Sequence, residues 1–172
     1  MNILEAGFLR RVRQHHAVEH ATITILMARN PGLPLVGGRS DHRGFFVYGP
    51  VETPMLAVAA QEALKRLKAG EARLAIHPNC GTNLVTAGAL AGVAALTAGT
   101  IARHRRGGLL DQMPAAILAA TGAVVASRPI GLRLQRQVTT LADVSDLQMG
   151  EITRRELGRL VQHFVVLEPT TA

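Results

Sequence analysis

Apolar residues in the first part of the chain recur in two patterns. Leu9 to Arg29 carries apolar side chains at helical spacing and is followed by Pro31-Gly32, which predicts an amphipathic helix. Leu35-Val36 and residues 45–48 are short apolar runs on either side of the polar segment 39–44. These runs predict two short strands joined as a hairpin.

A second helix and a third strand are expected next. Thr53-Pro54 has the form of an N-cap followed by a first-turn proline, and Gly70 marks the end of the helix that it opens. Residues 73–76 predict a third strand, which leads directly to His77.

The C-terminal part of the chain is polar again. Residues 147–155 and 160–167 predict a pair of strands that turns near Gly158, and a helix over residues 151–163 is the alternative.

Between these parts lie two long stretches that are almost free of charge. Gly81 to Ala102 holds no charged side chain, and Leu109 to Ser127 holds only Asp111, for which a capping or interfacial role is expected. About 20 apolar residues suffice to span a bilayer as a helix, and the short connection 103–108 predicts an antiparallel pair. A buried hairpin in a soluble protein is the alternative, but a chain of 172 residues leaves little material to cover two such helices.

The expected fold class is therefore α+β, a mixed helix and strand head interrupted by a two-helix transmembrane hairpin. Residues 1–80 form the N-terminal metal-binding head, residues 81–134 the hairpin, and residues 135–172 a C-terminal segment whose strands pack on the head. Gly88 and Gly92 have the small-residue spacing that lets helices approach closely in lipid, so a homo-oligomer through these faces is expected as well.

Composition and charge favour a membrane over nucleic acid as the partner. The formal net charge is +7, but only 3% of the residues are aromatic and no nucleic-acid module is evident. Arginine clusters flank the apolar stretches, where anionic headgroups would attract them. The first 15 residues contain three arginines in place of the apolar core of a signal peptide. Cys80 is the only cysteine, which excludes an internal disulfide.

The first predicted helix carries a motif with metal-site spacing. His16-x-x-Glu19-His20 is an inverted zincin pattern, in which two imidazoles one helical turn apart share a metal and the glutamate lies beside them. At roughly 100° per residue, these three side chains interrupt the middle of the apolar stripe, whereas His15 points toward its flank. A hydrogen-bonded His/Glu cluster in the core is the alternative. A buried carboxylate needs a proton, a partner or a cation, and a metal would supply the cation.

A second motif offers further ligands. His77-Pro78-Asn79-Cys80 places an imidazole and a thiol three positions apart, directly before the first apolar helix. The N-terminus of that helix would favour the thiolate form of Cys80. His16, His20, His77 and Cys80 together make a ligand set suited to zinc, with iron as the alternative metal. His42 and His104 are expected to be solvated or to face headgroups, and His163 is given no role.

The two motifs together resemble a family of uncharacterised bacterial membrane proteins with His-x-x-Glu-His and His-Pro-x-Cys-Gly-Thr-Asn, described at best as predicted metal-dependent enzymes. The resemblance extends to Gly38-Arg39-Ser40-Asp41 and to residues 137–140. It implies a metal site beside a bacterial cell membrane, in a multi-pass protein. This sequence departs from the inverted zincins in one respect, because no downstream glutamate is placed as their third ligand.

These observations lead to one main hypothesis and two alternatives. The main one is a zinc-dependent hydrolase, a peptidase or amidase acting on a peptide or a membrane-adjacent small molecule, with Glu19 as general base. The second is a membrane protein with a structural zinc, and the third is an adaptor without metal. Three protein ligands indicate catalysis, and four indicate a structural role. Six basic residues near the outer ends of the hairpin, against three in its connection, predict that both termini are cytoplasmic.

Overall fold

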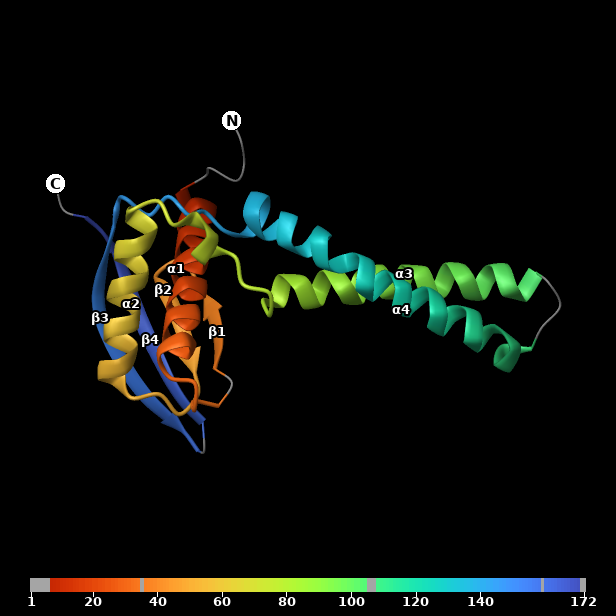
Figure 1. Ribbon diagram of the computed structural model, residues 1–172, viewed down its shortest axis with the longest axis horizontal. Helices are drawn as coiled ribbons and strands as arrows, with labels where there is room; N and C mark the ends of the chain where they lie inside the picture. Colours follow the sequence, from red (N-terminus) through yellow and green to blue (C-terminus); the bar gives the residue numbers. More distant parts are fainter. Residues whose placement is uncertain (1–6, 35, 105–107, 159, 171–172) are drawn as a thin grey trace. The chain divides into compact units, whose positions relative to one another are not determined.

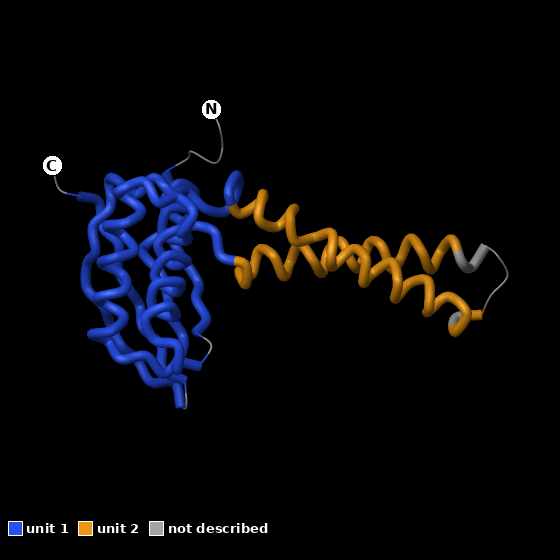
Figure 2. The backbone as a smooth tube through the Cα atoms, viewed as in Figure 1, with its two compact units in different colours: residues 1–77, 136–172 blue, residues 78–135 orange. Residues whose placement is uncertain are grey.

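The protein was analysed as a computed structural model that describes residues 7–34, 36–104, 108–158 and 160–170. The backbone divides into two compact units (Figure 2), unit 1 with residues 1–77 and 136–172 and unit 2 with residues 78–135. Each unit is described by itself. The mixed helix and strand content confirms the predicted α+β class.

Unit 1 is a four-stranded antiparallel sheet with two helices packed on it (Figure 1). The helices are α1 (Gly7–Arg29) and α2 (Thr53–Lys68), and they pack against each other. The strands are β1 (Gly37–Ser40), β2 (Gly44–Tyr48), β3 (Leu147–Leu157) and β4 (Leu160–Pro169), in the spatial order β1-β2-β4-β3. Consequently β2 lies beside β4, although more than 100 residues separate them in the sequence.

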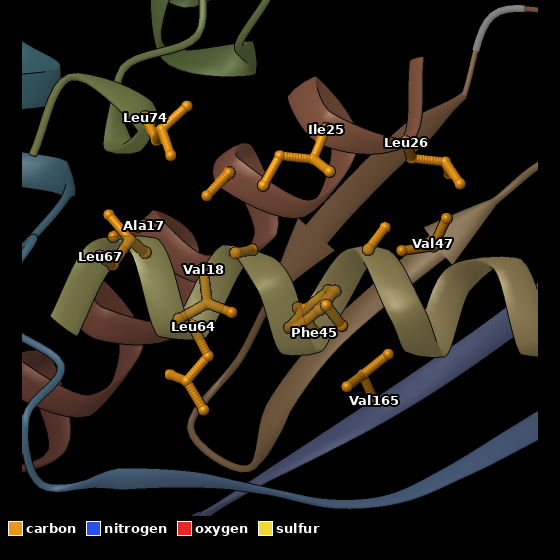
Figure 3. Close-up of a cluster of buried hydrophobic side chains, with 14 of the residues drawn as sticks. Ala17, Val18, Ile25, Leu26, Phe45, Val47, Leu64, Leu67, Leu74 and Val165 are labelled. Carbon is orange, nitrogen blue, oxygen red and sulfur yellow. The ribbon is translucent and has the colours of Figure 1, made fainter. Parts of the chain in front are cut away.

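The core of unit 1 lies between the helices and the sheet (Figure 3). Phe45 from β2 and Val165 from β4 form a cross-strand pair, and both are fully buried. Leu26 of α1 and Leu56 of α2 are also fully buried. Since the inward side chains come from both ends of the sequence, the C-terminal strands complete the sheet that the N-terminal hairpin begins.

Most of the predicted elements of unit 1 are confirmed, with shifted boundaries. The first helix and the C-terminal strand pair are confirmed, and the helix alternative over 151–163 is wrong. Gly158 has φ of 65°, a conformation that suits glycine at this turn. The first strand begins at Gly37, after Val36, while Leu35 lies outside the described residues.

Two local predictions are wrong. Residues 73–76 are not a strand, because the chain forms a short 3₁₀ helix, η2 (Ala72–Ala75), that buries Leu74 in the core. Thr53 is not the N-cap of α2. The cap is Glu52, which makes no side-chain capping bond, and the Thr53 hydroxyl instead pairs with Nε2 of His163 at 3.0 Å.

Unit 2 consists of two long helices that pack against each other (Figure 1), α3 (Gly81–His104) and α4 (Leu109–Leu134). By length and composition, Gly81–Ile101 and Leu110–Thr139 could each cross a membrane, and no residue of the most apolar window in the first span is buried. Asp111 accepts a hydrogen bond from the backbone N–H of Gly108 at 2.9 Å, which confirms its capping role. At the other end, Asn83 Oδ1 accepts a hydrogen bond from Gln135 Nε2 at 2.9 Å.

After α4 the helix widens into a π-helical turn, η3 (Gln135–Thr139). Wider turns of this kind leave carbonyl groups available to side chains. Arg13 of α1 donates to the carbonyl of Gln137 at 3.1 Å and to that of Thr140 at 3.3 Å. These hydrogen bonds connect the segment 136–140 to α1, the helix that carries the first motif. Arg105, Arg106 and the side chain of His104 lie outside the described residues.

Candidate metal centre

The two histidines of the first motif lie together on α1. The ring centroids of His16 and His20 are 4.3 Å apart, as expected for positions i and i+4 of a helix. His20 is 2% exposed and His16 is half-buried. The helix therefore presents two imidazoles on one face, at the edge of the core of unit 1.

Each of these rings is oriented by a backbone carbonyl. Nδ1 of His16 lies 2.9 Å from the carbonyl oxygen of Thr139, and Nδ1 of His20 lies 2.8 Å from that of Ala75. A carbonyl oxygen can only accept, so Nδ1 must donate in both rings. In the neutral imidazole, Nε2 then carries the lone pair that could coordinate a metal. Histidine ligands of metals usually donate their other ring N–H to a carbonyl or carboxylate in this way.

The local structure explains where these carbonyls come from. Ala75 lies in η2, whose tight turn directs its carbonyl at α1, and Thr139 ends the π-helical turn η3. Neither residue is recognisable as part of a site from its type, since only its backbone is used. For these two carbonyls the sequence offered one indication, since the family resemblance includes residues 137–140.

The described residues contain a group with the geometry of a metal site. His16, His20 and Cys80 each offer one ligand atom, and these atoms lie within 4.8 Å of one another. Cys80 is 7% exposed and immediately precedes α3, and its sulfur accepts a hydrogen bond from the backbone N–H of Thr82 at 3.4 Å. This bond and the helix N-terminus both favour the thiolate. Two imidazoles and a thiolate are ligands that suit a borderline-soft metal ion such as zinc.

His77 lies beside this group without belonging to it. Its ring centroid is 5.7 Å from that of His20, and the side chain is half-buried. Burial lowers the pKa of His77 below its usual value, which favours the neutral ring. The structure thus brings His77 next to the first motif, as the sequence predicted, but outside the set of three ligand atoms.

Glu19 is buried on the same face, with 5% of its surface exposed. Its carboxylate lies against the backbone of Gly38 in β1, where a Cβ atom would overlap with Oε1 and would lie 2.7 Å from Cδ. Gly38 therefore provides the space in which the carboxylate sits. The sequence analysis noted Gly38 only in the resemblance and gave it no role.

Two further polar residues of α1 were missed. His15 is fully buried, Nδ1 donates to the carbonyl of Asp41 at 2.7 Å, and Nε2 has no partner among the described residues. Burial lowers the pKa of His15. Gln14 is also fully buried and donates to the carbonyl of Asp143 at 2.9 Å and to the carboxylate of Asp146 at 2.6 Å. The helical wheel placed His15 on a flank, where the hairpin turn and not the apolar core covers it.

Comparison with known proteins identifies relatives without a known activity. Residues 11–152 match the family model described as Domain of unknown function (DUF6391). An uncharacterized protein of Picosynechococcus sp. is 38% identical over 96 residues, which cover 48% of this chain. The chain spans about half of the length of that relative, since the match covers 47% of it. No solved structure matches.

Proposed function

Because the chain belongs to the DUF6391 family, a domain of unknown function, its activity has to be inferred from its own site, and we propose a membrane-anchored, zinc-dependent hydrolase. The observation that carries the proposal is the orientation of His16 and His20. Each ring donates Nδ1–H to a carbonyl, which makes Nε2 the nitrogen that can coordinate, and the ligand atoms of His16, His20 and Cys80 lie within 4.8 Å of one another.

The ligand set of the proposal is His16, His20 and Cys80, with His77 close enough to join. Cys80 follows His77 by three residues, so the chain itself keeps the thiol near the ring that lies beside His20. With three protein ligands, one position is open to water or substrate, which is the arrangement of catalytic zinc sites. A zinc ion held by these residues would lower the pKa of a water molecule toward about 7 and would polarise a carbonyl.

The chain's own residues supply the proton transfer and the environment. Glu19 is buried three positions after His16 on the same helix, and we assign its carboxylate the role of the base that takes the proton from the attacking water. The water oxygen bonds to the carbonyl carbon, the C–N bond breaks, and Glu19 returns the proton to the leaving nitrogen. Burial of Glu19 excludes bulk water from that exchange.

The membrane part of the proposal rests on unit 2. Large apolar side chains of its helices are exposed, among them Leu84, Val85, Leu96 and Leu118, each more than 70% accessible. A soluble protein rarely presents that much apolar surface, whereas lipid would cover it. Cys80 immediately precedes the first of these helices, so we place the reaction at the membrane surface, on peptide or amide bonds near the bilayer.

Glu19→Gln in the full-length protein tests the hydrolase directly. The amide occupies the same space but cannot act as a base, so we expect full metal content with turnover of amide substrates lowered about 100-fold to 10,000-fold. The measurements are metal analysis and hydrolysis of a quenched fluorescent peptide library in proteoliposomes. An unchanged rate in Glu19→Gln would refute the role of Glu19.

A structural zinc is the second candidate, and the position of His77 is the observation that favours it. If His77 moves in as a fourth ligand, the tetrahedron closes and no water can bind. Cobalt substitution separates the two cases. Absorption spectra of the Co²⁺ protein that are unchanged by His77→Ala support three ligands with an open position, and a large spectral change supports the closed site.

A further inference from the structure

Helix α1, which carries His16, Glu19 and His20, packs against the edge strand β1 of the sheet. Strand β1 is the first in the order β1-β2-β4-β3, and among the described residues it pairs only with β2. An edge strand has a row of backbone N–H and C=O groups that can pair with another extended chain. Gly37, Gly38 and Arg39 are exposed, so this edge is accessible.

The register identifies which backbone groups face outward. Asp41 N–H donates to the carbonyl of Gly44 at 2.9 Å, so this is a hydrogen-bonded pair. In an antiparallel ladder such pairs alternate, and the next one is Arg39 with Phe46. The N–H and C=O groups of the residues in between, Gly38 and Ser40, therefore point away from β2.

One of these two residues is the one that touches Glu19. The carboxylate lies directly against Gly38, which links the outward edge of β1 to the general base of the proposed reaction. A chain hydrogen-bonded to Gly38 would pass beside Glu19 and, on the same helix face, beside His16 and His20.

The side chains of β1 leave room for such a chain. Gly37 and Gly38 have none, and glycine within a strand marks places where another backbone approaches closely. The Arg39 side chain is turned to the sheet face away from the site, with its guanidinium 4.9 Å from the centre of the Phe46 ring. Another chain approaching this edge of β1 would therefore meet mainly backbone N–H and C=O groups, which suits recognition by main-chain hydrogen bonds.

From these observations we infer that β1 binds the substrate, an extended peptide that adds to the sheet as a fifth strand by pairing with Gly38 and Ser40. Peptide recognition by strand addition obtains its affinity from main-chain hydrogen bonds and accepts many sequences. This inference rests on the proposed hydrolase function and adds its substrate class, an unfolded or extended polypeptide segment in place of a small amide.

Hydrogen exchange in the inactive Glu19→Gln protein, loaded with zinc, tests the binding mode without turnover. The probe is an acetylated nonapeptide of alternating valine and threonine at millimolar concentration. We expect slower exchange, by at least fivefold, at the amides of Gly38 and Ser40 and no change at Arg39, whose N–H already pairs with β2. The same peptide methylated on every amide nitrogen is the control and should protect neither.

Variants at Ser40 test the same edge through catalysis. Ser40→Pro removes the outward N–H and leaves the groups that pair with β2, so we expect KM for peptides to rise at least tenfold with the metal content unchanged. His42→Ala, a substitution in the adjoining turn that changes no backbone group of β1, is the control and should behave as the wild type. The inference is overturned if the wild-type enzyme cleaves peptides while Gly38 and Ser40 remain unprotected, or if Ser40→Pro cleaves them normally. Loss of metal binding in His16→Ala and His20→Ala together with unimpaired cleavage would instead overturn the hydrolase proposal.

Discussion

Helix α1 and the hairpin of unit 2 reverse the usual distribution of polar and apolar side chains in opposite ways. In α1, charged and polar residues are buried, including Glu19, His20 and His15. In α3 and α4, large apolar residues such as Leu96 and Leu118 are exposed. Each arrangement is unfavourable in water unless something compensates for it. In α1 the histidine rings pair with backbone carbonyls. We propose that a metal ion completes the compensation in α1 and that lipid provides it in the hairpin.

The two regions therefore depend on different partners. The buried polar face of α1 is fixed by specific donors and acceptors, so single substitutions should change a defined property. The hairpin has exposed apolar side chains in place of specific polar partners, so we expect its behaviour to depend on the polarity of a substituted side chain and not on its identity. The predictions below separate these two kinds of dependence.

The largest effect is expected from removing the histidine ligands. Purified protein should contain about one zinc per chain, and His16→Ala or His20→Ala should reduce this to a background level, because two ligands cannot hold the ion tightly. Unit 1 should also unfold more easily, since metal binding contributes to folding. Metal analysis and the fluorescence of Tyr48, the only tyrosine in a chain without tryptophan, measure the two effects.

His42→Ala is the matched control for this prediction. His42 is exposed in the turn between β1 and β2 and stacks on Phe8 with ring centroids 5.5 Å apart. The same substitution there should leave the metal content at the wild-type level. Retention of zinc in the double variant of His16 and His20 would show that the site lies elsewhere.

A charged residue within the apolar span of α3 should have the next largest effect. Leu96→Arg replaces a side chain that is 73% exposed within the candidate span Gly81–Ile101. An arginine inside a membrane helix costs up to about 2.5–3.5 kcal/mol, the value at the helix centre. We expect a clear loss of membrane-inserted protein after an alkaline wash of the membrane fraction. In water the same change at an exposed position would alter stability by about 0.5 kcal/mol or less.

Leu157→Arg provides the comparison within unit 1. Leu157 is 54% exposed at the end of β3, so the arginine should remain solvated and the membrane-inserted fraction should not change. Equal behaviour of the two variants would mean that the hairpin of unit 2 is not covered by lipid.

The same contrast explains how much could be predicted from the sequence. Periodicity predicted α1, because burial on one face leaves a repeating signal. The two apolar helices were predicted from long stretches almost free of charge, which are long enough to span a bilayer. The spacing of His16 and His20 predicted that their rings would meet, because helix geometry alone determines it. The pairing of β2 with β4 could not be derived in this way, since it depends on contacts between distant segments.

The parts of the site made of backbone were also beyond prediction. The carbonyl of Ala75 orients His20, but the segment 73–76 was predicted as a strand because Leu74, Ala75 and Ile76 form a short apolar run. Its 3₁₀ turn is determined by the burial of Leu74 and the direction of the following chain. Gly38 could not be assigned a role either, because a glycine gives no indication of which side chain will occupy the space beside it.

A third prediction concerns the orientation of the hairpin. Six basic residues near its outer ends, Arg66, Lys68, Arg73, Arg128, Arg133 and Arg136, outnumber the three in its connection, Arg103, Arg105 and Arg106. Positive charge favours the cytoplasmic side, so both termini should be cytoplasmic. A cysteine at position 104 should react with a membrane-impermeant thiol reagent in intact cells, and one at position 143 should not.

The wild-type chain is the control for this labelling, because it reports the reactivity of Cys80. Labelling at position 143 alone would reverse the orientation. Labelling at both positions would show that the two helices do not cross the membrane as proposed.

The smallest expected effect is a loss of stability in unit 1 at mildly acidic pH, caused by His163. This ring is fully buried, accepts or donates one hydrogen bond with Thr53, and has an unpartnered Nδ1 among the described residues. Burial, followed by repulsion from Arg154, lowers the pKa of His163, and the attraction of Glu52 offsets this only in part. The unfolded chain then binds the proton more readily than the folded protein. The contribution of neutral His163 to stability is therefore present above pH 6.5 and is lost as the pH falls through the pKa of His163 in the folded protein.

His163→Gln keeps a polar side chain without a titrating group. Denaturant unfolding of the metal-free proteins, followed by Tyr48 fluorescence between pH 7.5 and 5.5, should show a smaller decline in the variant. Parallel pH profiles would mean that the folded protein accommodates a charged His163 as well as the unfolded chain does.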